Sequence, residues 1–187
     1  ILFQLSHFIA ERSKTARKFI KLLGHPLPQS ELNVSEIPKH GKIDFDEIFD
    51  IVKSGHDIGI MSESGCPGIA DPGAEIVSWA HLKDIHVVPL VGPSSLLLAL
   101  MASGFSGQSF VFHGYLPADK EELVRKLRLL EVNANKLGQS QIFIETPYRN
   151  KKMFEAAMNT LLPGSKLSVH MGLTGPNAFS VTKTIKE

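Results

Sequence analysis

The stretch DIGIMSESGCPGIADPG, residues 57–73, indicates the fold class of this 187-residue chain. Its first five residues predict a short buried strand, and the next twelve contain three glycines and two prolines. Glycines let backbone N–H groups approach a ligand closely, whereas prolines hold a loop in one shape. Since ligands of parallel sheets bind beyond the carboxyl ends of strands, this loop is a candidate site for a small anionic or zwitterionic ligand.

On both sides of this loop, strand and helix patterns alternate along the chain. Predicted strands are 8–10, 57–61, 85–90, 109–113, 141–145, 166–171 and 178–185, the last two forming a hairpin. Predicted helices are 15–23, 44–53, 74–82, 95–102, 120–132 and 147–161, and residues 25–42 are predicted to be a loop. The alternation predicts an α/β fold with mainly parallel sheets in two lobes, 1–105 and 106–187, joined at a hinge over residues 104–108.

Composition limits the classes of protein and of partner. Twenty Lys and Arg against nineteen Asp and Glu leave a net charge of +1, so any nucleic-acid surface must be local. The densest basic stretch lies over residues 12–21, which a solvated helix face also explains. The single cysteine, Cys66, excludes an intrachain disulfide, and no Cys/His cluster at ligand spacing predicts a metal site. We expect a cytoplasmic protein without a membrane span.

Two residues of the first loop have simpler explanations than catalysis. Asp71 followed by Pro72 matches a helix N-cap and first helical residue, and this is the interpretation that we favour. A nucleophilic role for Cys66 is disfavoured because no histidine lies near it in the sequence. No capping rule explains residues 62–68, so a ligand explains that part better.

Two further loops follow predicted strands, and each leaves two explanations open. Ser94 could cap a helix or donate its hydroxyl to a ligand in the same cleft. Thr146 and Pro147 again match an N-cap and a first helical residue. Capping does not explain the neighbouring charges, but Glu145 and Arg149 are spaced to form a structural ion pair.

Five motifs in one order make the sequence similar to a known family. Residues 62–73 resemble the S-D-A-G-x-P-x-I-S-D-P-G loop of the tetrapyrrole methylase-like (class III) S-adenosylmethionine-dependent methyltransferases, in the branch that methylates small-subunit ribosomal RNA. The other four are VPLVGPSS (88–95), ASG (102–104), GYLP (114–117) and ETPYR (145–149), which resemble V-P-L-P-G-P-S-A, A-S-G, G-F-L-P and E-S-P-H-R. Ala10-Glu11 and Arg17-Lys18 resemble that branch's A-E-D-T-R-x-T-R-K.

This resemblance implies two α/β lobes with S-adenosylmethionine in the cleft between them, and a homodimer. It implies RNA of the small ribosomal subunit as substrate, methylated at a ribose 2′-oxygen. It also implies cofactor contacts at Gly65, Cys66, Pro67, Ile69, Ser94, Ser95, Thr146 and Leu173. The first loop is expected to bind the methionine carboxylate, and the two serines are expected to bracket the sulfonium.

A ribose hydroxyl that is methylated must lose its proton, and a carboxylate is the natural acceptor. Glu11, Glu63 and Glu145 each follow a predicted strand, so each is a candidate catalytic base. We rank Glu11 first because it precedes the basic stretch, where a phosphate backbone could be held. Glu63 could instead steer the positive charge of the cofactor, and Glu145 could be occupied by its ion pair.

The sequence also departs from the branch. It lacks the family's first strand with its T-P-I-G-N loop and the closing C-terminal strands, so we expect part of the cofactor pocket to be missing. Glu63 replaces an aspartate of the branch, and residues 12–14, RSK, replace D-T-R. Methylation of a tetrapyrrole ring remains a second hypothesis, and a non-catalytic ligand-binding module remains a third.

Overall fold

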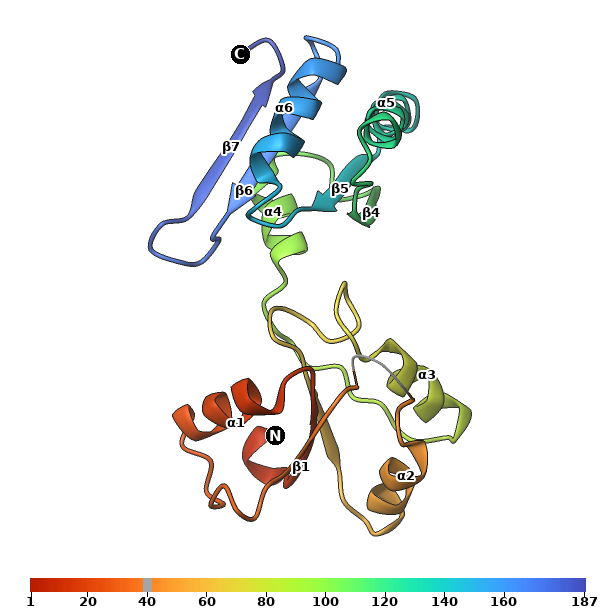
Figure 1. Cartoon of the computed structure of the whole chain (residues 1–187), viewed down its shortest axis with the longest axis vertical. Helices are drawn as coiled ribbons and strands as arrows, with labels where there is room; N and C mark the ends of the chain where they lie inside the picture. Colours follow the sequence, from red (N-terminus) through yellow and green to blue (C-terminus); the bar gives the residue numbers. More distant parts are fainter. Residues whose placement is uncertain (39–41) are drawn as a thin grey trace. The chain divides into compact units, whose positions relative to one another are not determined.

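The computed structural model describes residues 1–38 and 42–187, which divide into two units, Ile1–Pro93 and Ser94–Glu187 (Figure 1). Each unit has its own sheets and its own core. The helix that opens the second unit contacts the last two strands of that unit. The sequence-based boundary between residues 105 and 106 falls just after this helix.

The first unit contains one parallel three-stranded sheet in the order β2-β1-β3. Its elements are the 3-10 turn η1 (Leu2–Gln4), β1 (His7–Ala10), α1 (Ser13–Leu22), β2 (Asn33–Glu36), α2 (Phe45–Lys53), β3 (Ile58–Met61) and α3 (Ala74–Leu82). Ala10 pairs with both Glu36 and Met61, so the carboxyl ends of all three strands lie at one edge. The chain therefore leaves β1 and β3 side by side, where Glu11 N–H donates to the Met61 carbonyl at 3.0 Å.

Alternate side chains of β1 face opposite layers. Phe8 packs with Ile20 of α1, whereas Ile9 packs with Ile48 of α2 and Ile76 of α3. Helix α1 therefore covers one face of the sheet, and α2 and α3 cover the other, as Figure 1 shows. Burial on both faces explains why the last three residues of β1, Phe8 to Ala10, are all apolar, as is typical of parallel strands.

The second unit combines a parallel strand pair with an antiparallel hairpin. Its elements are α4 (Ser95–Ser103), β4 (Phe110–Tyr115), α5 (Lys120–Leu137), β5 (Ser140–Ile144), α6 (Asn150–Thr160), β6 (Lys166–Met171) and β7 (Phe179–Thr184). Strands β4 and β5 are parallel, and β6 and β7 form the predicted hairpin. The core gathers on α5, where Leu123, Leu127 and Leu130 pack with Leu116 and with Met153 of α6.

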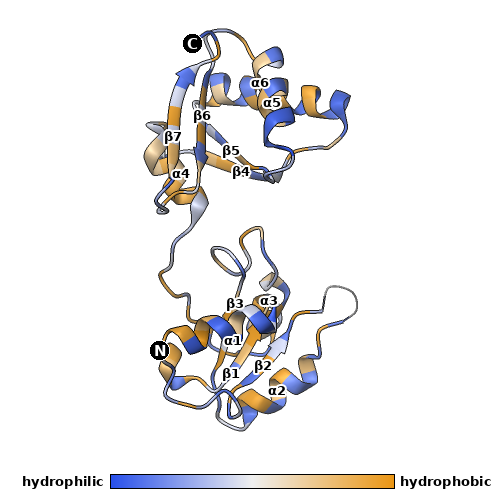
Figure 2. Ribbon diagram, turned by 60° about the vertical axis from the view of Figure 1, so that its left-hand side comes forward, coloured by the Kyte–Doolittle hydropathy of each residue, from blue (hydrophilic) through white to orange (hydrophobic). Residues whose placement is uncertain are grey.

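Helix α4 is apolar on all sides. Figure 2 colours much of it as hydrophobic, and its sequence, SLLLALMAS, contains no charge. It packs against β6 and β7, yet the side chains of Leu97 and Met101 are 52% and 80% exposed. The second unit therefore covers only one side of this helix.

Two sequence predictions of local structure are wrong. Residues 85–90 form no strand: β3 is the edge of the described sheet, and these residues do not pair with its open side despite their high β propensity. Val88 and Leu90 are each 58% exposed. The predicted loop over 25–42 contains β2, whose four residues include one apolar side chain and therefore carry little strand signal. Residues 39–41 of that loop lie outside the described residues.

Two helix ends also differ from the prediction. Helix α5 continues beyond residue 132 to Leu137, and Gly138 then ends it in the left-handed conformation at φ 60°. Helix α1 begins at Ser13, whose N–H and hydroxyl both donate to the Glu36 carboxylate at 2.8 and 2.9 Å. The cap of α1 therefore comes from the end of β2, which sequence rules for neighbouring residues do not detect.

Within residues 1–38 and 42–187, no helix is both long enough and apolar enough to span a bilayer.

Candidate functional site

The loop over residues 62–73 leaves the carboxyl end of β3 and closes on itself. Gly68 N–H donates to the Pro72 carbonyl at 3.1 Å, and the Ser62 hydroxyl donates to the Gly65 carbonyl at 3.2 Å. These bonds hold the two ends of the loop in a fixed turn. A rigid loop at this edge of a parallel sheet is where a ligand site is expected.

The tip of this loop presents free backbone donors beside open space. Gly65 has φ 105°, and apart from its neighbours in the chain no heavy atom lies within 4 Å of where its Cβ would be. Among the described residues, the N–H groups of Ser64, Gly65 and Cys66 donate to no partner. Successive unpaired N–H groups are the backbone arrangement that binds anions.

Carboxylates lie next to these donors. Glu11, directly after β1, accepts the Glu63 N–H at Oε2 over 3.0 Å. Burial raises the pKa of Asp71, the negative charge of Glu11 raises it further, and the nearby Ser62 hydroxyl opposes both. Asp71 Oδ2 is buried without a hydrogen-bond partner, and no described cation lies at ion-pair distance from Asp71 or Glu11. The site therefore offers both anion-binding N–H groups and uncompensated negative charge, which suits a zwitterion.

The prediction that Asp71 caps a helix is wrong. Helix α3 begins at Ala74, and its N-cap position is Gly73 at φ 128°, without a side-chain capping bond. A Cβ at Gly73 would meet Gly68 N and Ile60 Cγ2 at 3.5 Å. The neighbours would tolerate a Cβ at this distance, so it is the positive φ that calls for glycine where the helix starts, and Asp71 stays on the loop beside Glu11.

The stretch around Ser94 leads into α4. Ser94 occupies the N-cap position, and its carbonyl accepts the Leu98 N–H at 3.0 Å, but its hydroxyl makes no capping bond. The side-chain capping alternative is therefore wrong, and the hydroxyl stays available to a ligand. Ser95 is the first residue of α4, and Leu173 lies in the turn between β6 and β7.

The stretch 145–149 follows β5. Glu145 Oε2 and Arg149 Nη2 form an ion pair at 3.1 Å, which confirms the structural alternative for these charges. The expected capping by Thr146 is wrong, because Arg149 occupies the N-cap position of α6 and the helix begins at Asn150. Thr146 instead turns back on its neighbour: its N–H and its hydroxyl donate to Glu145 Oε1 at 2.7 and 3.2 Å.

The predicted site residues fall into two sets. The first unit holds Glu11, Glu63, Gly65, Cys66, Pro67 and Ile69, on one loop and the adjoining end of β1. The second unit holds Ser94, Ser95, Glu145, Thr146 and Leu173, on three segments. Those three segments share no hydrogen bond in the described part of the chain.

The basic residues over 12–21 are of two kinds: one makes contacts within the fold, and others are exposed to solvent. Arg17 donates to the Gln29 and Leu32 carbonyls at 2.9 and 3.1 Å, so it ties α1 to the following loop. The remaining basic side chains of α1 are exposed: Lys14, Lys18 and Lys21. The sequence does not distinguish Arg17 from these lysines, because the contacts of Arg17 depend on how the loop after α1 folds back.

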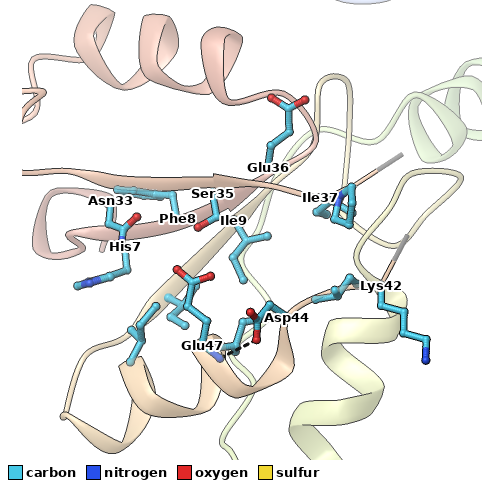
Figure 3. Close-up of a pocket in the computed structure, with 15 residues that line it drawn as sticks. His7, Phe8, Ile9, Asn33, Ser35, Glu36, Ile37, Lys42, Asp44 and Glu47 are labelled. Atoms are coloured by element: carbon cyan, nitrogen blue, oxygen red, sulfur yellow. Dashed lines mark hydrogen bonds between the residues drawn. The ribbon is translucent and has the colours of Figure 1, made fainter. Parts of the chain in front are cut away.

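A pocket of about 210 Å³ lies between the first sheet and α2 (Figure 3). Phe8, Ile9 and Ile48 are among its apolar lining, and His7 and Glu47 are among its polar lining. None of the predicted site residues lines it. His7 marks the amino end of β1, and burial together with His56 lowers its pKa. The pocket extends along β2 to Glu36 at its carboxyl end, but no residue of the loop over 62–73 lines it. Across residues 1–38 and 42–187, no three His, Cys, Asp or Glu side chains are arranged to hold a metal ion.

The chain is similar in sequence to proteins of known name. No family model matches it. It is 38% identical over 143 residues to ribosomal RNA small subunit methyltransferase I of Bacillus subtilis, which covers 75% of this chain and 47% of that protein. The Thermotoga maritima protein of the same name is 33% identical over 137 residues, which covers 72% of this chain and 58% of that protein. The chain is a distant homologue of ribosomal RNA small subunit methyltransferase I. It spans about half the length of these curated relatives.

Solved structures share the fold of this homologue. The methyltransferase CobJ matches with a TM-score of 0.56 at 15% identity, covering 98% of this chain and 87% of that one. The cobalt precorrin-4 methyltransferase CbiF matches with a TM-score of 0.58 at 17% identity, covering 99% and 77%. These likenesses show the α/β fold of tetrapyrrole methylases. With the parallel pairing of β1 with β2 and β3 and of β4 with β5, they confirm the α/β class with parallel sheets, whereas the cleft between two lobes stays a prediction.

Proposed function

We propose that this homologue acts in methyl transfer from S-adenosylmethionine to a ribose 2′-oxygen of small-subunit ribosomal RNA. The observation that carries the proposal is the loop over 62–73, with free N–H donors beside open space, in a chain whose relatives are named for methylating that RNA. The cofactor cleft between two lobes, the homodimer and the cytoplasmic location expected from the sequence are parts of the same proposal.

The residues of the first unit fit the zwitterionic end of this cofactor. The N–H groups over residues 64–66 bind the methionine carboxylate, and the open space at Gly65 admits it. The negative charge of Glu11 and Asp71 favours the ammonium and the sulfonium. The proposed contacts are Gly65, Cys66, Pro67 and Ile69 in the first unit, and Ser94, Ser95, Thr146 and Leu173 in the second.

When bound, S-adenosylmethionine supplies an electrophilic methyl group. The chain's task is to hold the acceptor hydroxyl in line and to take its proton. Glu11 is the proposed base, because its Oε1 makes no hydrogen bond with any described residue. Glu63, which is exposed, is the second candidate. Glu145 is the weakest, because its side chain is 7% exposed and is paired with Arg149.

The surface of α1 supports RNA as the substrate. Lys14, Lys18 and Lys21 are exposed on this helix, which starts two residues after Glu11. Such side chains contact phosphates and so orient a nucleic acid without reading its sequence. The alternative of tetrapyrrole methylation has the likeness to CobJ and CbiF in its favour, but at 15% and 17% identity that likeness concerns the fold alone. A non-catalytic module would bind the cofactor without turnover.

Calorimetry with S-adenosylhomocysteine tests the cofactor site. Gly65→Trp fills the space beside the free N–H groups, so we expect it to weaken affinity at least about tenfold, which corresponds to 1.4 kcal/mol. Gly55→Trp is the matched control, because Gly55 also has a positive φ and open surroundings but lies between α2 and β3. Absence of binding by the folded, unsubstituted chain, or equal affinity of both variants, would contradict the proposed site.

The same chain incubated with labelled S-adenosylmethionine separates the three functions. We expect label in small ribosomal subunits, and none in a corrin or porphyrin substrate. Label in the tetrapyrrole alone would establish the second hypothesis. Cofactor binding without label in either substrate would establish the non-catalytic module.

A further inference from the structure

The hydrogen-bonding groups of Thr146 are almost fully used inside the second unit. Its N–H and its hydroxyl hydrogen are both donated to Glu145 Oε1, at 2.7 and 3.2 Å. Its carbonyl accepts the N–H groups of Arg149 and Asn150 at 2.9 and 3.1 Å. A hydroxyl that has donated its hydrogen retains oxygen lone pairs. Thr146 can therefore offer an outside group only one thing, which is an acceptor oxygen.

The carboxylate that sets this orientation is itself held from the opposite side. Glu145 Oε2 lies 3.1 Å from Arg149 Nη2, and the same nitrogen donates to the Leu116 and Pro117 carbonyls at 3.1 Å each. Leu116 is buried in the core beside α5. A continuous set of contacts thus runs from the main chain after β4, through Arg149 and Glu145, to the Thr146 hydroxyl. Oε1 is held by the two hydrogen bonds from Thr146, whereas Oε2 accepts no hydrogen bond and is held by the charge of Arg149 alone.

We propose that Glu145 and Arg149 are positioning residues, which hold the Thr146 hydroxyl as a hydrogen-bond acceptor for a donor group of the cofactor, an amine or a hydroxyl. This inference rests on the proposed function. A hydroxyl that donates to a carboxylate becomes a stronger acceptor, because the two hydrogen bonds polarise each other. The carboxylate also disfavours an anionic group at this point, so the methionine carboxylate is excluded from it.

A purely structural tether is the competing explanation of the same contacts. Such a tether would hold the loops after β4 and β5 together, and its loss would lower stability without changing which ligand groups are recognised. A positioning role makes a different prediction, because it ties Thr146 and Glu145 to one donor of the ligand. Recognition of individual donors is therefore the readout that separates the two explanations.

The test is calorimetry with S-adenosylhomocysteine and with analogues that each lack one donor: the deamino, N6-dimethyl, 2′-deoxy and 3′-deoxy compounds. Thr146→Val removes the acceptor while keeping the shape, so we expect affinity for S-adenosylhomocysteine to fall about tenfold. One of these analogues lacks the donor that Thr146 contacts. We expect that analogue to bind Thr146→Val and the unsubstituted chain with equal affinity. Thr146→Ser should restore both the affinity and the discrimination. Glu145→Gln should reduce the discrimination against the same analogue.

Glu155→Gln is the matched control, because Glu155 also pairs with a cation four residues away, Lys151, but both side chains are exposed. We expect it to leave affinity and discrimination unchanged. If Thr146→Val lowers the affinity for every ligand by the same factor, or leaves all affinities unchanged, the positioning inference is overturned while the proposed function stands. A Glu145→Gln variant that unfolds earlier but discriminates normally also overturns it. If the unsubstituted chain binds none of the ligands, the proposed function fails, and this inference fails with it.

Discussion

The two units place carboxylates at the ends of parallel strands but compensate their charge differently. In the first unit, Glu11 lies near enough to Asp71 to raise its pKa, and no described cation pairs with either. In the second unit, Glu145 is almost buried and is paired with Arg149 at 3.1 Å. Charge compensated within the fold supports the fold, whereas uncompensated charge can attract a cationic group from outside. The comparison therefore separates the strand edge that we propose to bind a ligand from one whose charge is compensated within the fold.

The largest expected effect comes from removing the ion pair between Glu145 and Arg149 in the second unit. Arg149→Met leaves the Glu145 carboxylate unpaired and leaves the Leu116 and Pro117 carbonyls without their donor. We expect the free energy of unfolding of this unit to fall by about 3 kcal/mol, as when one partner of a buried ion pair is removed. The single tryptophan, Trp79, lies in the first unit. The urea midpoint followed by circular dichroism should therefore fall, whereas the midpoint followed by Trp79 fluorescence should stay unchanged.

Lys151→Met is the control for this prediction. Lys151 pairs with Glu155 at 4.0 Å on the exposed side of α6, so its loss should cost at most about 0.5 kcal/mol. Equal shifts for Arg149→Met and Lys151→Met would show that the Glu145 pair does not brace the unit. A shift in Trp79 fluorescence as large as that in circular dichroism would show that the two units unfold together.

A smaller effect, dependent on pH, is expected in the first unit. The folded chain raises the pKa of Asp71, so it holds this proton more tightly than the unfolded chain does. The stabilisation is complete below the unfolded pKa near 4 and is lost as the pH rises through the folded pKa. Asp71→Asn cannot ionise, so at pH 7 it should be more stable than the parent by roughly 0.5–1 kcal/mol. Urea unfolding followed by Trp79 fluorescence measures this difference, which should vanish near pH 3.5.

Two further variants sharpen this prediction. Glu31→Gln removes an exposed acid from a loop of the same unit and should leave the pH dependence unchanged. Glu11→Gln removes the neighbouring charge and should shrink, but not abolish, the gain from Asp71→Asn, because burial is the larger cause of the shift. A gain at pH 7 that persists at pH 3.5 would mean that packing, and not ionisation, is responsible.

How well the sequence predicts the fold depends on how local the deciding interactions are. The period of Leu123, Leu127 and Leu130 predicts α5, because one helix face carries the signal and buries it. Strands depend on neighbours. β2 carries little apolar signal and forms because β1 lies beside it, whereas residues 85–90 have strong β propensity and no described partner. Propensity alone therefore misjudged both segments.

The candidate site shows the same limit. Motif order led to the loops after β3 and β5, because strand ends and glycines are visible in the sequence. The contact of Arg149 with Leu116 joins residues 33 positions apart, and Glu11 meets Glu63 across 52 positions. Capping rules, which consider only neighbouring residues, consequently assigned Asp71 and Thr146 to helix starts that the fold forms differently.

The smallest expected effect concerns backbone strain in a loop of each unit. Ala70, in the loop after β3, and Thr174, between β6 and β7, adopt left-handed conformations at φ 61° and 72°. Such a conformation costs an L residue about 1–2 kcal/mol, and the cost is higher for a β-branched side chain. Glycine relieves this strain but adds about 0.4–1 kcal/mol of unfolded-chain entropy. We therefore expect Ala70→Gly to change stability by less than about 0.5 kcal/mol and Thr174→Gly to stabilise by up to about 1 kcal/mol.

Ala102→Gly, at an exposed position of α4, is the reference for glycine without strain relief, and it should destabilise by about 1 kcal/mol. Trp79 fluorescence follows Ala70→Gly, and circular dichroism follows the two substitutions in the second unit. If Ala70→Gly destabilises as much as Ala102→Gly, the loop after β3 stores no strain at Ala70. Its shape would then come from its internal hydrogen bonds, such as that from Gly68 to Pro72. If Ala70→Gly instead stabilises more than Thr174→Gly, the larger strain lies in the first unit, beside the uncompensated carboxylates, where strained backbone is expected at a functional site.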